Sequence, residues 1–210
     1  MRLRLHTRYQ NSAGERVRIV LNLKGIGYEY VGTGSPRSES YRAINPQGLM
    51  PALEVDGQFV AQSTAIVELL EELFPEPPIF PGDAVARARV RAFANLICAD
   101  LHPLNNQRVR RYLAERMQAP DAAVQDWYAN WIAEAFMALE TEVAAHPATD
   151  RFCFGDQPTF ADACLVPQMA NARRFDCDLS PYPHLVRIDA ACQALDAFAK
   201  ARPDRQPDAP

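Results

Sequence analysis

The chain lacks any long hydrophobic run. No stretch of its 210 residues approaches the roughly 18 consecutive apolar residues that a membrane-spanning helix needs. The first ten residues, MRLRLHTRYQ, also lack the apolar core of a signal peptide. We therefore expect a protein that is not exported, acts in the cytoplasm and does not enter a membrane.

Closely spaced cysteines and an excess of positive charge are missing as well. The five cysteines are scattered, with no C-x-x-C pair, which argues against a disulfide framework or a zinc site and predicts buried, reduced thiols and no metal. A net charge of −4 argues against nucleic acid as a partner, because general nucleic-acid binding favours a basic surface. With 48% hydrophobic and 23% charged residues, the composition is that of a globular protein of one or two domains.

Hydrophobic periodicity predicts strand, helix and strand in the first part of the chain. Leu3 and Leu5 alternate with arginines, which is typical of a strand. From Ser12 the pattern becomes helical and ends near Gly25, and residues 28–31 form a second strand pattern. This order is a βαβ unit.

Residues 44–72 add a hairpin and a helix. Two apolar runs, 49–55 and 58–61, flank the dipeptide Asp56-Gly57, which is a strong hairpin signal. Pro51 cannot donate to a sheet, so we expect it at a strand start or edge, with Met50 unusually exposed and its backbone free to bind a ligand. Ser63 is the expected N-cap of the next helix. Such a helix start suits a carboxylate or phosphate, although an ordinary cap that binds nothing is the alternative.

These elements give an α/β domain followed by an all-α domain. The order βαβββα predicts a thioredoxin-like domain over residues 1–75. A proline-rich segment then suits an extended linker over 76–84, and helical patterns dominate the remainder, 85–210, above all 85–113 and 121–145. Thr159 is the expected N-cap of a later helix, with Asp162 completing an acidic capping box. The proline-rich tail from 201 to 210 is expected to be extended and loosely held.

Residues 45–66 contain three short motifs, N-P-Q-G-x-x-P-A-L, D-G and Q-S-x-A-I. Together they resemble the glutathione-binding half of glutathione transferases. They are most similar to the zeta class, which includes maleylacetoacetate and maleylpyruvate isomerases, and G-D-x-P-T-x-A-D at 155–162 resembles a helix start of their all-α domain. The resemblance implies glutathione as cofactor and a homodimer. It also implies that Pro51 is cis, that the Met50 backbone pairs with the cysteinyl part of glutathione, and that Gln62 and Ser63 hold the γ-glutamyl carboxylate.

The start of the first helix is where such an enzyme activates the thiol of glutathione. Hydroxyl or amide donors at a helix N-terminus stabilise a thiolate. Alignment on Arg16 puts Asn11 and Ser12 where the family has serines and Ala13 where it has cysteine or threonine. Either Ser12, the first choice, or Asn11 would be the catalytic donor, and local turn and cap chemistry is the alternative for both.

A second set of candidates resembles the substrate-binding residues of the isomerases. The run H-P-L-N-N-Q-R contains Asn106 and Arg108 at the positions that face the family's active site, and His102 is either a general base or a satisfied buried histidine. Arg174, before a phenylalanine, stands where the family binds a substrate carboxylate, a role that suits its planar fork. Arg173 is the better candidate for an ordinary surface charge.

The resemblance favours glutathione-dependent cis–trans isomerisation of a maleyl-type dioxo acid. The partner is then a small, acidic electrophile. Two departures favour an alternative, a transferase that conjugates or dehalogenates another electrophile: Gln10 stands where the isomerases have a substrate-binding arginine, and the loop at 32–40 is shorter than theirs. A second alternative, a glutathione-binding protein without catalysis, is favoured by Asn11 and Ala13.

Overall fold

The computed structural model describes residues 1–210, which form two compact units. The first unit contains residues 1–79 together with 193–210, and the second contains residues 80–192. The expected division assigned all of 85–210 to the helical domain. The observed division differs from it because the end of the chain, from residue 193, packs into the first unit.

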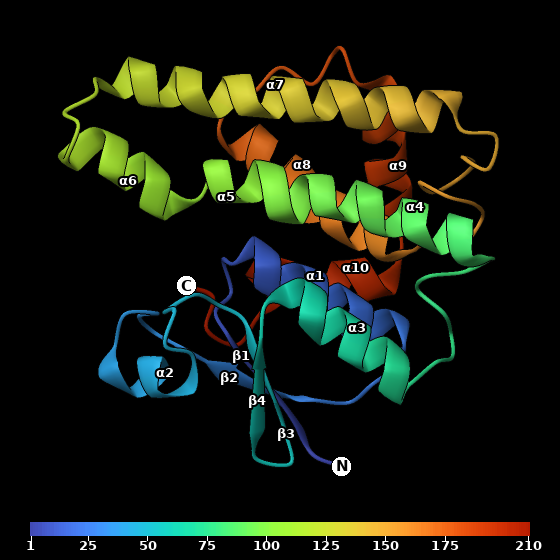
Figure 1. The fold of residues 1–210 in the computed structure, drawn as a ribbon, viewed down its shortest axis with the longest axis horizontal. Helices are drawn as coiled ribbons and strands as arrows, with labels where there is room; N and C mark the ends of the chain where they lie inside the picture. Colours follow the sequence, from blue (N-terminus) through green and yellow to red (C-terminus); the bar gives the residue numbers. More distant parts are fainter. The chain divides into compact units, whose positions relative to one another are not determined.

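The first unit is a four-stranded sheet with helices (Figure 1). Its elements in chain order are β1 (Leu3–Thr7), α1 (Ser12–Leu23), β2 (Glu29–Gly32), α2 (Glu39–Ile44), β3 (Ala52–Val55), β4 (Gln58–Ala61), α3 (Ser63–Leu73), α10 (Asp196–Ala201) and the short 3₁₀ helix η2 (Pro203–Arg205). The sequence predicted the strands, α1 and α3, so the thioredoxin-like fold is confirmed. Helix α2 was not predicted, because this short helix lies in a segment rich in serine and without a clear apolar period.

The sheet has the strand order β2-β1-β3-β4. Strand β1 runs parallel to β2 and antiparallel to β3, with Leu5 opposite Leu53. The hairpin of β3 and β4 turns at Asp56 and Gly57, whose φ angles of 48° and 88° are both in the left-handed region that a tight two-residue hairpin turn requires. Pro51 precedes β3, as predicted for a residue that cannot donate to the ladder.

Apolar faces of α1 and α3 and the inward side of the sheet form the core of this unit. Leu5 and Leu53 are fully buried, as are Val17 on α1 and Ile66 and Leu70 on α3. Burial of a side chain of this size stabilises a fold by about 1.5–3 kcal/mol. These contacts hold the start of α1 and the start of α3 in fixed places on the unit.

The tail is ordered, so the expectation that residues 201–210 are loosely held is wrong. Asn22 on α1 donates to the carbonyl of Ala197 at 2.8 Å, and Ala201 on α10 is fully buried. Gln206 is buried as well, and its amide donates to two carbonyls near the end of α10. Local composition missed this order because it depends on packing against a helix far away in the sequence.

The second unit is built from helices and includes the longest helix of the chain (Figure 1). Its elements are α4 (Ala84–Asn95), a π-helical segment η1 (Leu96–Leu101), α5 (His102–Leu104), α6 (Gln107–Glu115), α7 (Asp121–Ala145), α8 (Phe160–Arg174) and α9 (Pro183–Gln193). None of the helices has the length and apolar character to cross a membrane.

The predicted helical stretch over 85–113 is broken near Asn105. The side chain of Asn105 donates to the carbonyl of Tyr128, and Asn106 caps a new helix, α6. Asparagine favours such local capping over continuation of a helix. The capping box of α8 is confirmed, because Asp162 accepts from the backbone N–H of Thr159 at 2.8 Å while the Thr159 side chain caps the helix.

Candidate functional site

The entry into β3 presents an unpaired backbone. The Met50–Pro51 peptide bond is cis, as the family resemblance implied. Sheet pairing begins only at Ala52, and neither the N–H nor the carbonyl of Met50 forms a hydrogen bond within the chain. Met50 is buried, so the expectation of unusual exposure is wrong, although its backbone N–H and carbonyl have no partner within the chain. An unpaired extended backbone of this kind suits a peptide ligand.

Residues of helix α2 and its C-cap fix the backbone of Leu49, the residue before Met50. The Leu49 carbonyl accepts hydrogen bonds from the Tyr41 hydroxyl at 2.9 Å and from the Asn45 side chain at 2.6 Å. Burial raises the pKa of Tyr41 to about 12, so its hydroxyl stays a donor at neutral pH. The short helix that the sequence did not reveal thereby fixes the residue before Met50.

The N-terminus of α3 is uncapped. The N-cap residue is Gln62 rather than Ser63, and its side chain makes no cap bond but donates to Gln47. The backbone N–H groups of Ser63, Thr64 and Ala65 form no hydrogen bond within the chain, and the first turn contains no acidic residue. Three unpaired N–H groups at the positive end of a helix suit a carboxylate, as the sequence predicted for this position.

Two further features support an anion site at this position. Gln62 has a φ of 72°, a conformation that is uncommon outside glycine and that concentrates at functional sites. Behind Ser63 lies the buried guanidinium of Arg16, whose Nη1 donates to the Ser63 hydroxyl oxygen at 3.3 Å. The expected N-cap role of Ser63 is therefore wrong, and its hydroxyl instead lies between a cation and the helix start.

The start of α1 places Asn11 and Ser12 at adjacent positions. Asn11 is the N-cap, and its side-chain oxygen accepts from the backbone N–H of Gly14, so its amide nitrogen points away from the helix. Ser12 is the first helical residue and is half-buried, whereas Gln10 is exposed. A Cβ at Gly14 would come within 2.1 Å of the Thr7 hydroxyl, which explains why this close approach of α1 to β1 needs glycine.

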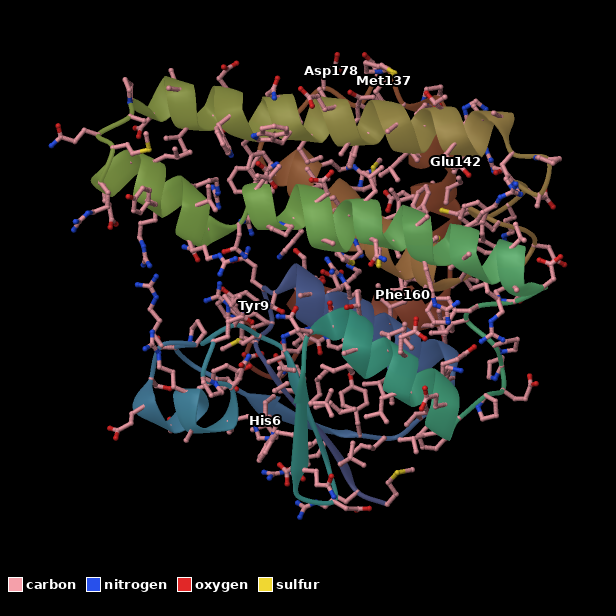
Figure 2. The ribbon with its side chains drawn as sticks, in the orientation of Figure 1. His6, Tyr9, Met137, Glu142, Phe160 and Asp178 are labelled. Atoms are coloured by element: carbon pink, nitrogen blue, oxygen red, sulfur yellow. The ribbon has the colours of Figure 1, made fainter.

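The loop from Arg8 to Asn11 is held by residues that the sequence analysis did not single out. Arg18 is fully buried and donates to the carbonyls of Arg8, Tyr9 and Ala201 at 3.4, 3.2 and 2.9 Å. Burial lowers the pKa of Arg18. From the tail, Asp208 accepts from the Tyr9 backbone N–H at 3.2 Å and from the Tyr30 hydroxyl at 2.6 Å. Tyr9 marks this loop in Figure 2.

Two of the protein's own thiols, those of Cys153 and Cys192, are poor nucleophiles. All five cysteines are free, and Cys153, Cys164 and Cys192 are fully buried. Burial raises the pKa of Cys153 and of Cys192, and the nearby Asp162 carboxylate raises both further. A thiol in such surroundings stays protonated and inert. No group of three or more His, Cys, Asp or Glu side chains is arranged to hold a metal ion.

The second unit contains the other predicted residues. Asn106 caps α6 by accepting from the backbone N–H of Arg108 at 3.0 Å, so its side-chain oxygen is already used. Arg108 is exposed and has no ion pair, and His102 is half-buried at the junction of η1 and α5. The fold brings Asn106 and Arg108 together at the start of α6.

The two arginines at the end of α8 differ. Arg173 forms an ion pair with the buried Asp189 at 2.6 Å, so it is not the ordinary surface charge that the sequence predicted. Arg174 has no ion pair, and its guanidinium carbon lies 4.7 Å from the centre of the Phe175 ring. Arg110, which the sequence analysis did not single out, contacts the same ring.

The first unit is thioredoxin-like, with an unpaired residue before a cis-proline and an uncapped helix start, and the second unit is all-helical. Together these features define the glutathione transferase class. The chain matches the glutathione S-transferase N-terminal domain over residues 7–78 and the glutathione S-transferase C-terminal domain over residues 125–203. It is 45% identical to a maleylpyruvate isomerase of Ralstonia, over 98% of this chain and 99% of that relative. The chain therefore belongs to the glutathione S-transferase family, in its zeta class.

Solved structures agree with this assignment. The holo structure of a maleylpyruvate isomerase, a bacterial zeta-class glutathione S-transferase, superposes with a TM-score of 0.96 at 44% identity and covers 99% of this chain and 100% of that one. A maleylacetoacetate isomerase from Methylobacterium extorquens AM1, with bound malonate and glutathione, gives a TM-score of 0.93 at 39% identity and covers 99% of each chain.

Proposed function

We propose that this chain is a glutathione-dependent cis–trans isomerase of a maleyl-type dioxo acid, maleylpyruvate or maleylacetoacetate. The observation that carries the proposal is the similarity over nearly the whole chain to a maleylpyruvate isomerase, at 45% identity. The uncapped start of α3 and the unpaired Met50 backbone supply what glutathione binding requires.

Glutathione is proposed to lie along the first unit. Its γ-glutamyl carboxylate binds the free N–H groups at the start of α3, with the Ser63 hydroxyl and the Gln62 side chain beside it, because the helix dipole and the Arg16 charge both favour an anion there. Its cysteinyl backbone pairs with Met50, next to the cis Pro51. The predicted effect of Ser63→Ala is at least tenfold weaker glutathione binding, which calorimetry measures.

The thiolate is proposed to form at the start of α1. A neutral thiol adds slowly, so the sulfur needs a donor that favours its charged form near neutral pH. Ser12 is our first choice. The second is Asn11, whose amide nitrogen points away from the Gly14 N–H and is available to donate. Ser12→Ala is expected to lower turnover while glutathione stays bound.

The reaction proposed is addition, rotation and elimination. The thiolate adds to one carbon of the cis double bond, which leaves a carbanion stabilised by the neighbouring carbonyl and a single bond that rotates. Elimination of the thiolate then forms the trans double bond, so glutathione is regenerated and no oxidant or reductant is needed. Arg174 binds a substrate carboxylate, with Arg108 and Asn106 for further oxygens and with His102 and Gln10 as the remaining proposed substrate contacts. Arg174→Ala is expected chiefly to raise KM for an acidic substrate.

A second candidate is conjugation or dehalogenation of another electrophile by glutathione. The observation that favours it is Gln10, which is exposed and uncharged in the loop before α1. The third candidate, a non-catalytic glutathione-binding protein, rests on Asn11 and Ala13 in place of the family's usual residues. Turnover of maleylpyruvate and maleylacetoacetate, compared with conjugation of a chlorinated aromatic in the same preparation, decides among the three. Conjugation without isomerisation would refute the isomerase proposal.

The proposal includes a homodimer and a cytoplasmic location. Phe59 on the edge strand β4 is 44% exposed, which suits an apolar contact with a second copy. Light scattering that returned the mass of one chain would contradict the dimer. Five free cysteines suit a reducing compartment, and fractionation of cells tests the location.

A further inference from the structure

Two arginines of the second unit share one aromatic ring. The guanidinium carbon of Arg110, on α6, lies 4.2 Å from the centre of the Phe175 ring, and that of Arg174 lies 4.7 Å from it. The ring of Tyr128, on α7, lies 4.2 Å from that of Phe175 and 5.4 Å from the Arg110 guanidinium. We call these four residues the Phe175 cluster. By the sum of their distances to Phe175, the two cations lie within about 9 Å of each other.

The Phe175 cluster contains no carboxylate. Neither Arg110 nor Arg174 forms an ion pair, and Arg110 Nε is buried without a hydrogen-bond partner. By contrast, Lys24 pairs with a glutamate at 2.6 Å, and Arg173, next to Arg174 in sequence, pairs with an aspartate at 2.6 Å.

This arrangement is unfavourable until an anion binds. Burial lowers the pKa of Arg110, and the charge of Arg174 lowers it further, while Tyr128 acts in the opposite direction. An arginine stays charged at neutral pH even so, so the protein keeps two neighbouring cations without a counter-ion. A bound anion removes both the repulsion and the unpaired donors, and the gain appears as affinity.

The aromatic platform also orients the guanidinium groups. Tyr128 is buried. The backbone of Phe175 is fixed by two hydrogen bonds: its N–H donates to the Asn171 carbonyl at 3.1 Å, and its carbonyl accepts from the Gln125 side chain. A guanidinium stacked on a ring leaves its N–H groups directed outward in its own plane. That is the geometry for a two-point contact with a carboxylate.

We propose that Arg110 is a substrate-binding residue, which together with Arg174 forms one anion site in the Phe175 cluster. The chemical class it selects is a small dicarboxylate, since two cations without a carboxylate compensate two negative charges better than one. The inference rests on the proposed function in one respect, the role of Arg174 as a carboxylate ligand. It makes Arg110 a determinant of specificity for dianionic over monoanionic or uncharged substrates.

Malonate is the probe, with calorimetric titration of the glutathione-loaded protein. Arg110→Leu is expected to weaken malonate binding at least tenfold, and Arg110→Lys, which keeps the charge but not the planar fork, by less. The matched control is Arg111→Leu on the same helix, whose side chain faces Glu115 at 3.9 Å, and it is expected to bind malonate as the wild type does. In turnover, Arg110→Leu is expected to raise KM for the dioxo acid more than it raises KM for an uncharged electrophile.

Thermal unfolding separates binding from a structural role. Leucine keeps the apolar contact with the rings and removes an uncompensated cation, so the unfolding midpoint of Arg110→Leu stays equal to or rises above that of the wild type. A lowered midpoint with unchanged malonate affinity would assign Arg110 to ring stacking and overturn the proposal. Wild-type protein that binds no malonate would overturn it too. If the wild type fails to isomerise maleylpyruvate while Arg110→Leu still loses malonate, the proposed function fails and the anion site stands.

Discussion

The replacement Ser12→Ala tests how the chain activates a thiol. Ser12 is the first residue of α1, a position where alanine is well tolerated, so the fold is expected to stay intact. A hydrogen bond to a charged group contributes about 1.5–3 kcal/mol, and one pKa unit corresponds to about 1.4 kcal/mol. The loss of a Ser12 donor therefore raises the pKa of the bound glutathione thiol by about 1–2 units.

The assay is titration of the thiolate of bound glutathione by its ultraviolet absorbance. The thiolate fraction near neutral pH, and with it turnover, falls about ten- to a hundredfold for such a shift, while the dissociation constant of glutathione changes little. The companion variant is Asn11→Asp. Aspartate caps a helix as well as asparagine does, so it preserves the contact with the Gly14 N–H but replaces the outward-pointing amide by a carboxylate oxygen.

The two variants decide between the donors. If Asn11 is the donor, Ser12→Ala leaves the thiol pKa nearly unchanged, whereas Asn11→Asp raises it because it removes a donor and adds a negative charge. If Ser12 is the donor, Ser12→Ala gives the full shift. A thiol pKa that stays within about 0.3 units of the wild-type value in both variants would refute activation at the start of α1 and favour the non-catalytic alternative.

Three further predictions concern the scaffold of the first unit. Lys24→Met is expected to lower the free energy of unfolding by about 3–5 kcal/mol in denaturant titration, because it leaves the buried Glu71 carboxylate without its 2.6 Å partner. Asp208→Ala removes the acceptor of the Tyr9 N–H and of the Tyr30 hydroxyl, and it is expected to lower turnover on the order of two- to tenfold. The pKa of Glu54 is lowered by its hydrogen bond to a histidine and by a nearby arginine, so the stabilising effect of Glu54 is lost as the pH falls below about 4.5. In the Glu54→Gln variant, the unfolding midpoint is therefore expected to fall less steeply in acid than in the wild type.

Local signals predicted the parts of the fold that local geometry determines. The Asp56-Gly57 turn and the Thr159 cap were readable because each needs particular residue types within four positions. Helix α1 was predicted from Ser12 because its apolar positions repeat at helical spacing. The cis form of Pro51 came from the family resemblance, since no local pattern distinguishes a cis from a trans proline.

The features that were missed depend on contacts distant in sequence. The tail is ordered by a hydrogen bond from Asn22 on α1, which composition near residue 201 does not reveal. Ser63 was expected as the cap, but the left-handed backbone at Gln62 moves the cap one residue earlier. Arg110 lies among ordinary helix formers, and only the folded second unit shows that it shares the Phe175 ring with Arg174.

The most direct test of the central claim is a nuclear magnetic resonance time course with much less glutathione than substrate. The proposed isomerase converts all maleylpyruvate to its trans isomer, and the free glutathione at the end equals the amount added, because each elimination returns the thiolate. A reaction that stops after one equivalent of glutathione, with a stable thioether as product, would contradict the claim and establish a conjugating transferase.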